Sequence, residues 1–350
     1  MLSPETLTEA QHVMTVCNAC RYCEAYCPVF QAMENRTAFA KGDILYLSNL
    51  CHNCGECLYA CQYAPPHEFN INVPRVLAEA RVASYEEYCW PRSWAAFRHA
   101  PGVIISLVGS LFFAWILRNF VRTPDAHGDF YAAIPHDVMV AGFGVVSLFV
   151  MLVLTIGVVR AARSFGLPHG VNYGRWLRDV LTLRHLHTTG EDCTSNVDER
   201  TPWRRYFHHL TFYGFALCFA STSVAALYHT VFGWSAPYAY TSLPVLLGTA
   251  GGLGLVVGPI GLLVQRGRRD PQLGDPSQRE LDVTFIAMLV MTSGSGLALL
   301  AFRGGGAMVP LLLLHLGSVV VLFATLPYGK FVHGIYRALA LLKFSAEAHQ

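Results

Sequence analysis

Six long apolar segments follow residue 101 and limit what this chain can fold into. Each is about 20 residues or longer, the length that an α-helix needs to cross the hydrocarbon core of a bilayer. Lipid offers the backbone no hydrogen-bond partners, so long segments of this kind form helices. Only 14% of the residues are charged, against about 25% in a typical soluble domain. The predicted spans are 102–121, 137–159, 207–232, 241–264, 282–302 and 308–328.

Positive charge is distributed unevenly over the connections between these spans. Cytoplasmic loops of membrane proteins carry an excess of Lys and Arg. Arginines are concentrated in the connections 160–205 and 265–280, and the C-terminal tail adds Lys330, Arg337 and Lys343. The opposite side has only Arg122 and Arg303, with Arg118 near a helix end. The asymmetry predicts six transmembrane helices with both termini in the cytoplasm. The net charge of +2 gives no indication of nucleic-acid binding.

Eight of the eleven cysteines form two runs of equal spacing near the N-terminus. Each run has the pattern C-x-x-C-x-x-C-x-x-x-C, which in bacterial ferredoxins holds two [4Fe–4S] clusters. Three thiolates on one tight loop can cap three corners of a cubane, and the fourth corner needs a cysteine from a distant part of the chain. We therefore predict one cluster on Cys17, Cys20, Cys23 and Cys61, and another on Cys51, Cys54, Cys57 and Cys27.

Two other interpretations of the cysteines were weighed. Zinc also takes four thiolates, but its sites usually use pairs of C-x-x-C rather than two equal triple runs. Residues 1–30 show no basic start followed by an apolar core, so we expect no signal peptide and a cytoplasmic location. Disulfides are rare in that reducing compartment, where dense cysteines usually bind metal.

The residues around the cysteines resemble a known module. The spacer 28–50 and the segment 70–74 are similar to the α-helical ferredoxin module of succinate dehydrogenase and heterodisulfide reductase. The resemblance covers about residues 12–85 and implies short helices around the clusters. The segment 73–89 has apolar residues at helical spacing and predicts an amphipathic helix. The expected fold is all-α, with an iron–sulfur domain in residues 1–90 and a six-helix transmembrane bundle in residues 91–350.

Histidines in the predicted spans are candidate haem ligands. Ionisable residues inside a membrane are costly and suggest a function, and neutral imidazole is a common axial ligand of haem iron. Spans three and six run antiparallel in this topology. His208 or His209 should then face His333 towards the cytoplasm, and His229 should face His315 towards the outer side. We predict one or two b-type haems on His208, His209, His229, His315 and His333, and interpret His99, His127 and His136 as interfacial residues.

The histidine pair of the sixth span also carries a resemblance. The stretch from His315 to His333 looks like the last haem-binding helix of the nitrate reductase γ subunit, where a histidine pair at this spacing ligates haem. The segment 207–212 loosely resembles the partner helix. In that family the second ligand on this helix comes about ten residues later, where this chain has Leu217, Cys218 and Phe219. His229 is the substitute for the outer haem.

Over nearly its full length the chain resembles the tricarballylate/citrate utilisation protein B family. The order of two cluster motifs, the six spans and the segment 207–214 carry the match. The resemblance implies a soluble FAD-dependent tricarballylate dehydrogenase as partner, whose reduced flavin is reoxidised by this chain. We expect an electron-transfer subunit of an oxidoreductase in the bacterial cytoplasmic (inner) membrane, which uses two [4Fe–4S] clusters and haem b to reduce membrane quinone. No catalytic residue is predicted.

Two further hypotheses remain open at this point. The donor could differ, as in a relative of heterodisulfide reductase. Alternatively, the chain could be a transporter or redox sensor in which clusters only report or stabilise. Against transport, the spans contain almost no carboxylates and show no inverted repeat with paired broken helices.

Overall fold

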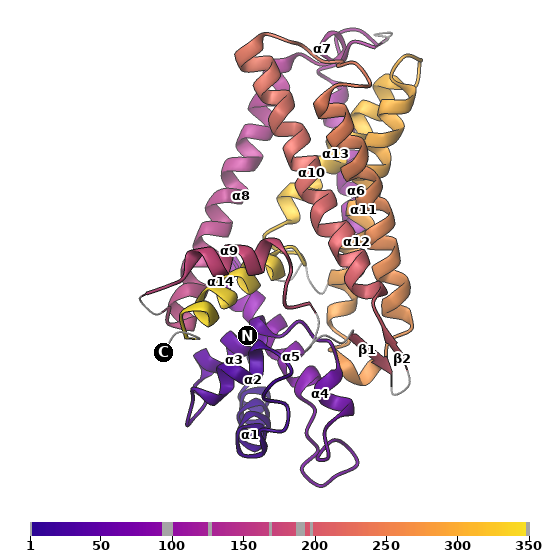
Figure 1. Ribbon diagram of the computed structural model, residues 1–350. Coiled ribbons are helices and arrows are strands. Elements are labelled where there is room, and N and C mark those ends of the chain that lie inside the picture. The colour runs from indigo at the N-terminus through magenta and orange to yellow at the C-terminus, as the bar shows by residue number, and fades with distance from the viewer. Residues whose placement is uncertain are drawn as a thin grey trace.

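The computed structural model describes residues 2–92, 101–124, 128–167, 170–186, 193–196 and 199–347. Within these ranges the regular secondary structure is almost entirely helical, which confirms the predicted all-α fold class. A small helical module lies at one end of a long helical bundle, and both chain termini lie at that same end (Figure 1). The predicted domain boundary near residue 90 falls just before residues 93–100, which are outside the described ranges, as are His99 and His127.

The N-terminal module is built from five helices. Ser3 begins the first helix, because its hydroxyl accepts a hydrogen bond from the Thr6 amide at 3.0 Å. The third helix is central, and its residues from Ile44 to Leu50 are all buried. The fifth helix confirms the helix predicted over 73–89, and most of its residues are buried within the module. The helices are α1 (Pro4–Cys20), α2 (Pro28–Glu34), α3 (Lys41–Leu50), α4 (Glu56–Tyr59) and α5 (Val73–Tyr88).

Six apolar helices make up the bundle in the described residues. They are α6 (Gly102–Arg118), α8 (His136–Phe165), α10 (Trp203–Phe232), α11 (Leu243–Gly267), α12 (Gln278–Phe302) and α13 (Met308–Thr325). All except α6 are long and apolar enough to cross a membrane, and α6 is a shorter apolar helix of 17 residues. Large apolar side chains such as Leu148 and Val145 are exposed on the outer surface of the bundle, as expected of a lipid-facing surface.

Glycines allow α10 and α11 to approach closely. A Cβ atom added at Gly251 would lie 2.8 Å from the Gly214 carbonyl oxygen and 2.8 Å from the Cys218 amide. A Cβ atom at Gly254 would lie 3.0 Å from the Leu210 carbonyl oxygen. Small residues at such positions let membrane helices pack backbone against backbone. This packing fixes the position of α10, which carries His208 and His209.

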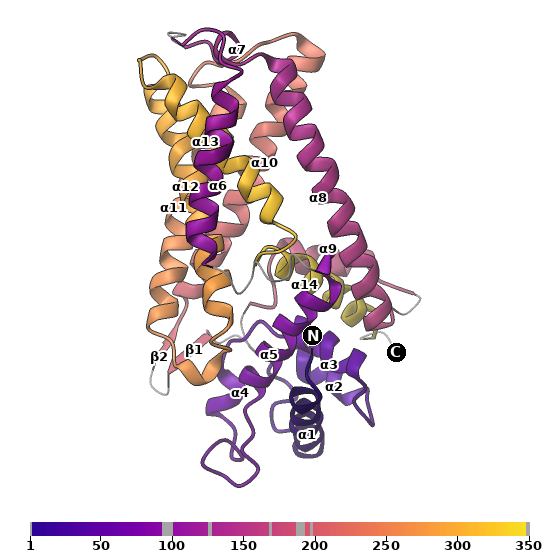
Figure 2. The same cartoon turned by 180° about the vertical axis from the view of Figure 1, so that it is seen from behind.

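Shorter elements lie at the two ends of the bundle. The helix α7 (Phe130–Ala133) lies at the end far from the module, whereas α9 (Tyr173–Leu181) and α14 (Val332–Glu347) cross the other end, between bundle and module (Figures 1 and 2). The strands β1 (Cys193–Asn196) and β2 (Glu199–Thr201) form an antiparallel hairpin. The 3-10 helix η2 (Pro271–Leu273) contacts the module, where Asn72 donates a hydrogen bond to the Gln272 carbonyl at 3.0 Å.

The last predicted span ends earlier than expected. We placed it at 308–328 and put His333 in the same helix, but α13 ends at Thr325 and a new helix, α14, begins at Val332. Pro327 has no amide hydrogen to continue the helix. The amides of Tyr328 and Gly329 turn back to the Thr325 carbonyl at 3.0 and 2.9 Å. His333 therefore belongs to the helix that crosses the end of the bundle.

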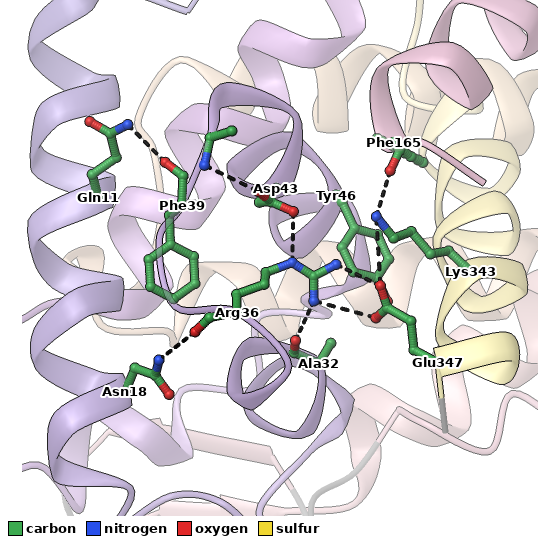
Figure 3. A network of polar contacts seen from close by, with 11 residues as sticks. Gln11, Asn18, Ala32, Arg36, Phe39, Asp43, Tyr46, Phe165, Lys343 and Glu347 are labelled. Atoms are coloured by element: carbon green, nitrogen blue, oxygen red, sulfur yellow. Dashed lines mark hydrogen bonds and ion pairs between the residues drawn. The ribbon is translucent and has the colours of Figure 1, made fainter. Parts of the chain in front are cut away.

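The far end of α14 is held to the module by buried charges (Figure 3). Arg36 donates to the Asp43 carboxylate at 2.7 Å and to the Glu347 carboxylate at 2.6 Å. The same guanidinium also donates to the Ala32 carbonyl. The side chain of Arg36 is only 9% exposed and that of Glu347 only 13%, so each charge depends on the other for the hydrogen bonds that water would supply.

Neighbouring groups extend this contact to α8. Tyr46 donates its hydroxyl hydrogen to Glu347 at 3.1 Å, and Lys343 lies 3.6 Å from the same carboxylate. Lys343 also donates to the Phe165 carbonyl at the end of α8, at 2.5 Å. The module, α8 and α14 thus share one polar network.

We predict that Glu347→Gln weakens the docking of α14. The substitution leaves Arg36 with Asp43 but removes its second anionic partner, and a hydrogen bond to a charged group contributes about 1–3 kcal/mol. The unfolding temperature of the purified full chain in detergent should fall measurably. Glu68→Gln is the matched control, because Glu68 is exposed. Equal unfolding temperatures for both variants would contradict the role assigned to Glu347.

Candidate functional site

The two cysteine runs lie where helices of the module end and begin. Cys17 and Cys20 belong to the last turn of α1, which ends because Arg21 adopts a left-handed conformation with φ of 57°. The Arg21 amide donates to the Cys17 carbonyl at 2.8 Å. Cys27 caps the start of α2, and Cys51 follows the end of α3. Of these, Cys27 lies at a helix N-terminus, where exposed backbone amides favour the negative charge of a thiolate, whereas Cys17, Cys20 and Cys51 lie at helix C-termini.

The cysteines surround two neighbouring pockets in the crossed arrangement predicted from the sequence. The first pocket is lined by the first three cysteines of one run and the last of the other: Cys17, Cys20, Cys23 and Cys61. The second pocket is lined by the reciprocal set: Cys27, Cys51, Cys54 and Cys57. Cys57 also reaches the first pocket, so the two pockets adjoin there.

The chemistry of these pockets fits metal clusters. Burial, together with the neighbouring Cys61, raises the pKa of Cys23 to about 12. Burial and the adjacent Cys51 likewise raise the pKa of Cys27 to about 12. Four thiols that oppose one another's ionisation become thiolates only when a cation compensates their charge. Among the described residues, no three His, Cys, Asp or Glu side chains are placed to hold a single metal ion. The thiols surround each pocket instead, as a cubane requires.

Arginines from the membrane bundle reach the loop of the second pocket. Arg204, at the start of α10, donates to the carbonyls of Asn53 at 2.7 Å and His52 at 3.1 Å. Arg269, which follows α11, donates to the Asn53 carbonyl at 2.6 Å and to its side-chain oxygen at 2.9 Å. The loop that carries Cys51 and Cys54 is thereby attached to two bundle helices.

Two more arginines donate hydrogen bonds to the backbone of the same loop. Arg337 on α14 donates to the Leu50 carbonyl at 2.8 Å, and Arg81 on α5 donates to the Cys51 carbonyl at 2.5 Å. From the sequence, Arg204, Arg269 and Arg337 indicate only membrane topology, and Arg81 is not singled out. The signal that could have found two of them is spacing, since each lies four residues from a candidate haem ligand. We call the four residues the arginine cage: Arg81, Arg204, Arg269 and Arg337.

His208 and His333 are brought together next to this loop. Their ring centres lie 6.1 Å apart and the rings are nearly perpendicular, at 87°. A metal–imidazole bond is about 2 Å long, and roughly 1 Å more separates the nitrogen from the ring centre, so two rings sharing one metal have centres ~6 Å apart. His333 Nδ1 lies 2.6 Å from the Lys330 carbonyl oxygen, to which it donates. That bond leaves Nε2 unprotonated and able to bind a metal.

The structure distinguishes between the two neighbouring histidines of α10. His208 Nδ1 is buried without a hydrogen-bond partner, an orphaned polar atom of the kind that needs an explanation. His209 Nδ1 instead lies 2.8 Å from the Arg205 carbonyl oxygen, and its ring contacts Tyr213 at 5.8 Å. Of the two alternatives left open by the sequence, His208 is the one that faces His333.

The structure does not pair His229 with His315, as the sequence predicts for the outer haem. His229 does not face His315: its ring stacks on His136, with centres 3.9 Å apart, and lies 5.5 Å from Tyr131. The reason is its position in the last turn of α10, beside the start of α8. His136 had been interpreted only as an interfacial residue.

His315 points to α12 instead. Its Nδ1 lies 3.1 Å from the Thr292 carbonyl oxygen and 3.2 Å from the Ser295 hydroxyl. Gly296 provides room for the ring, because a Cβ atom there would lie 2.8 Å from His315 Cε1. The Thr292 carbonyl can orient this imidazole as the Lys330 carbonyl orients His333.

Known proteins match the chain over almost its whole length. A family model described as Citrate utilization protein B matches residues 93–350, and one described as Citrate utilization protein B Fer4-like domain matches residues 10–87. A citrate utilization protein B of Escherichia coli is 47% identical over 352 residues, which cover 98% of this chain and 93% of that protein. No solved structure matches.

The crossed pockets predict which cysteine affects which cluster. We expect about eight iron atoms and eight sulfides per chain in protein purified without oxygen, from two cubanes. Cys27→Ser should reduce this content by about half and damage the cluster of the second run, because the fourth ligand comes from the other run. Iron and sulfide analysis with electron paramagnetic resonance would measure both effects.

Cys218→Ser serves as the control, because Cys218 lies on α10, away from both pockets. Stoichiometric zinc without sulfide would refute the cluster assignment. Loss of the first-run cluster in Cys27→Ser would refute the crossing.

Proposed function

Because the chain belongs to the citrate utilization protein B family, we propose that it carries electrons from a soluble FAD-dependent tricarballylate dehydrogenase to membrane quinone. The observation that carries the proposal is the adjacency of the second cysteine pocket and the histidine pair, joined through Arg204 and Arg337. When bound, two [4Fe–4S] clusters and haem b supply one-electron carriers between a two-electron flavin and the quinone.

Each group of residues has a defined task in this proposal. The eight cysteines of the two pockets would hold the clusters, and His208 and His333 would hold the haem iron. The Lys330 carbonyl keeps the His333 proton on Nδ1, so that Nε2 remains a ligand. Arg204 and Arg337 fix the distance between pocket and histidines, because each lies one helical turn from its histidine on the same face.

The exposure of the first pocket supports it as the site that the partner approaches. Its surrounding loops are open to solvent, with Tyr22 67% exposed and Phe69 43% exposed. The second pocket is covered by the bundle through Arg204 and Arg269. A soluble flavoprotein could therefore approach the first pocket closely, and exposed aromatic side chains are common in protein interfaces.

The architecture also supports six spans, with both termini in the cytoplasm of a bacterial cell. The C-terminal helix α14 is bound to the N-terminal module through Arg36 and Glu347. An even number of crossings is needed to bring both to one side of a membrane. The five longer helices alone would give an odd number, so α6 is the sixth span in this proposal. Its 17 residues rise about 25 Å, close to the ~30 Å of a bilayer core.

Reporter fusions test this topology. Green fluorescent protein fused after Gln350 should fluoresce in the cytoplasm, whereas alkaline phosphatase inserted near Pro124 should be active in the periplasm. Arginine-rich connections stay inside by the positive-inside rule. A periplasmic C-terminus would contradict six spans.

Substitution of the histidines tests the haem assignment. His208→Ala and His333→Ala should each remove the reduced α-band of haem b, because iron with a single protein ligand is weakly held and affinity falls more than about tenfold. His209→Ala is the matched control and should keep the band, since His209 faces Tyr213. Absorption spectra of purified protein would measure this.

The same variants test the proposed path. Reduced flavoprotein should still bleach the clusters of His333→Ala, because their cysteines lie in the module, while quinone reduction stalls. Normal quinone reduction by His333→Ala would show that haem does not lie on the path. Loss of haem from His209→Ala but not His208→Ala would overturn the choice between them.

A further inference from the structure

The arginine cage gives the two cysteine pockets different electrostatic surroundings. Its four guanidinium groups all donate to backbone oxygens of residues 50–53, beside the second pocket. The first pocket has one comparable contact, in which Arg21 donates to the Asn18 carbonyl at 3.1 Å. Arg21 is exposed to solvent, and solvent screens exposed charges strongly.

The cage has no carboxylate counter-ion in the described part of the chain. None of its four residues forms an ion pair with a described Asp or Glu, and Arg81 is buried. Burial lowers the pKa of Arg337 to about 10 and that of Arg269 to about 9. Both values lie above neutrality, so the guanidinium groups stay charged at pH 7.

A buried carboxylate, Glu56, acts in the opposite direction on a cysteine of the first pocket. Glu56 is buried, accepts a hydrogen bond from the Thr194 hydroxyl, and raises the pKa of Cys23 in the first pocket. A reduced iron–sulfur cluster carries one more negative charge than the oxidised one. Positive surroundings favour the reduced form and negative surroundings oppose it, and net charge is among the factors that set cluster potentials.

We propose that the arginine cage raises the reduction potential of the cluster in the second pocket above that of the cluster in the first. The inference rests on the proposed function, in which both pockets hold [4Fe–4S] clusters. Electrons would leave the reduced flavin of the partner one at a time at the first pocket and pass from there to the second. The electron then resides preferentially beside His208 and His333, at the membrane side of the module, so the cage gives electron transfer its direction.

The order of the two potentials is the first test. The purified full chain is titrated with dithionite under redox mediators and followed by electron paramagnetic resonance. The signal lost in Cys27→Ser identifies the second-pocket cluster, and the signal lost in Cys61→Ser identifies the other. The second-pocket cluster should be reduced at the higher potential. The reverse order, or equal potentials, overturns the inference while leaving the proposed function intact, whereas the absence of both signals refutes the proposed function itself.

Removal of single charges is the second test. Arg269→Gln and Arg81→Gln keep an amide donor but lose the charge, and each should lower the equilibrium constant for reducing the second-pocket cluster about tenfold, or 59 mV for one electron. Arg269→Lys should restore most of the potential. Arg75→Gln is the matched control, because Arg75 is exposed and pairs with Glu79 at 3.0 Å.

Unchanged midpoint potentials in both glutamine variants would show that the cage does not set the difference, and would overturn the proposal. A fall in Arg75→Gln equal to that in Arg269→Gln would do the same. If the glutamine variants fail to assemble the second cluster, the order of potentials in the wild-type chain decides the question alone.

Discussion

The two halves of the chain are joined where Arg204, Arg269 and Arg337 donate hydrogen bonds to the backbone carbonyls of Leu50, His52 and Asn53. These carbonyls follow the end of α3, where a helix leaves its last oxygens without partners. On a free module, water would donate hydrogen bonds to these carbonyl oxygens. Here the bundle covers the loop, and guanidinium groups donate the hydrogen bonds instead of water. A charged donor is stronger than a neutral one, so the loop is held firmly against the bundle. The position of the second pocket relative to the membrane helices depends on this contact.

The same helices that hold the loop also set the positions of the histidines. Arg204 precedes His208 by four residues on α10, and Arg337 follows His333 by four residues on α14. Residues four apart lie on one face of a helix, so the face that holds the loop also presents an imidazole beside it. The Arg36–Glu347 contact attaches the far end of α14 to the module as well. The helix that carries His333 is therefore held to the module at two places, by Arg337 and by Glu347.

Much of this architecture could be predicted from the sequence, and the remainder has identifiable physical reasons. Cysteine spacing and apolar length are local signals, so the pocket membership and the helical spans were predictable. The choice between His208 and His209 was not, because adjacent residues on a helix point about 100° apart and only packing shows which one faces inward. The partner of His229 required knowledge of how α8 lies against α10. Pro327 and Gly329 favour a helix end after Thr325, but the apolar pattern continues past them and predicts an unbroken span.

The arginines show why a topology signal and a functional signal can coincide. The positive-inside rule counts Arg204, Arg269 and Arg337 as residues that keep loops in the cytoplasm. In the fold the same three side chains are half-buried and donate hydrogen bonds to the backbone of a cysteine loop. A buried positive charge without a carboxylate partner is costly, and topology alone could be maintained by exposed lysines. The cost is offset if the loop binds a negatively charged group, such as an iron–sulfur cluster with four thiolates. The partial burial of these arginines therefore supports the proposal that the second pocket holds such a cluster.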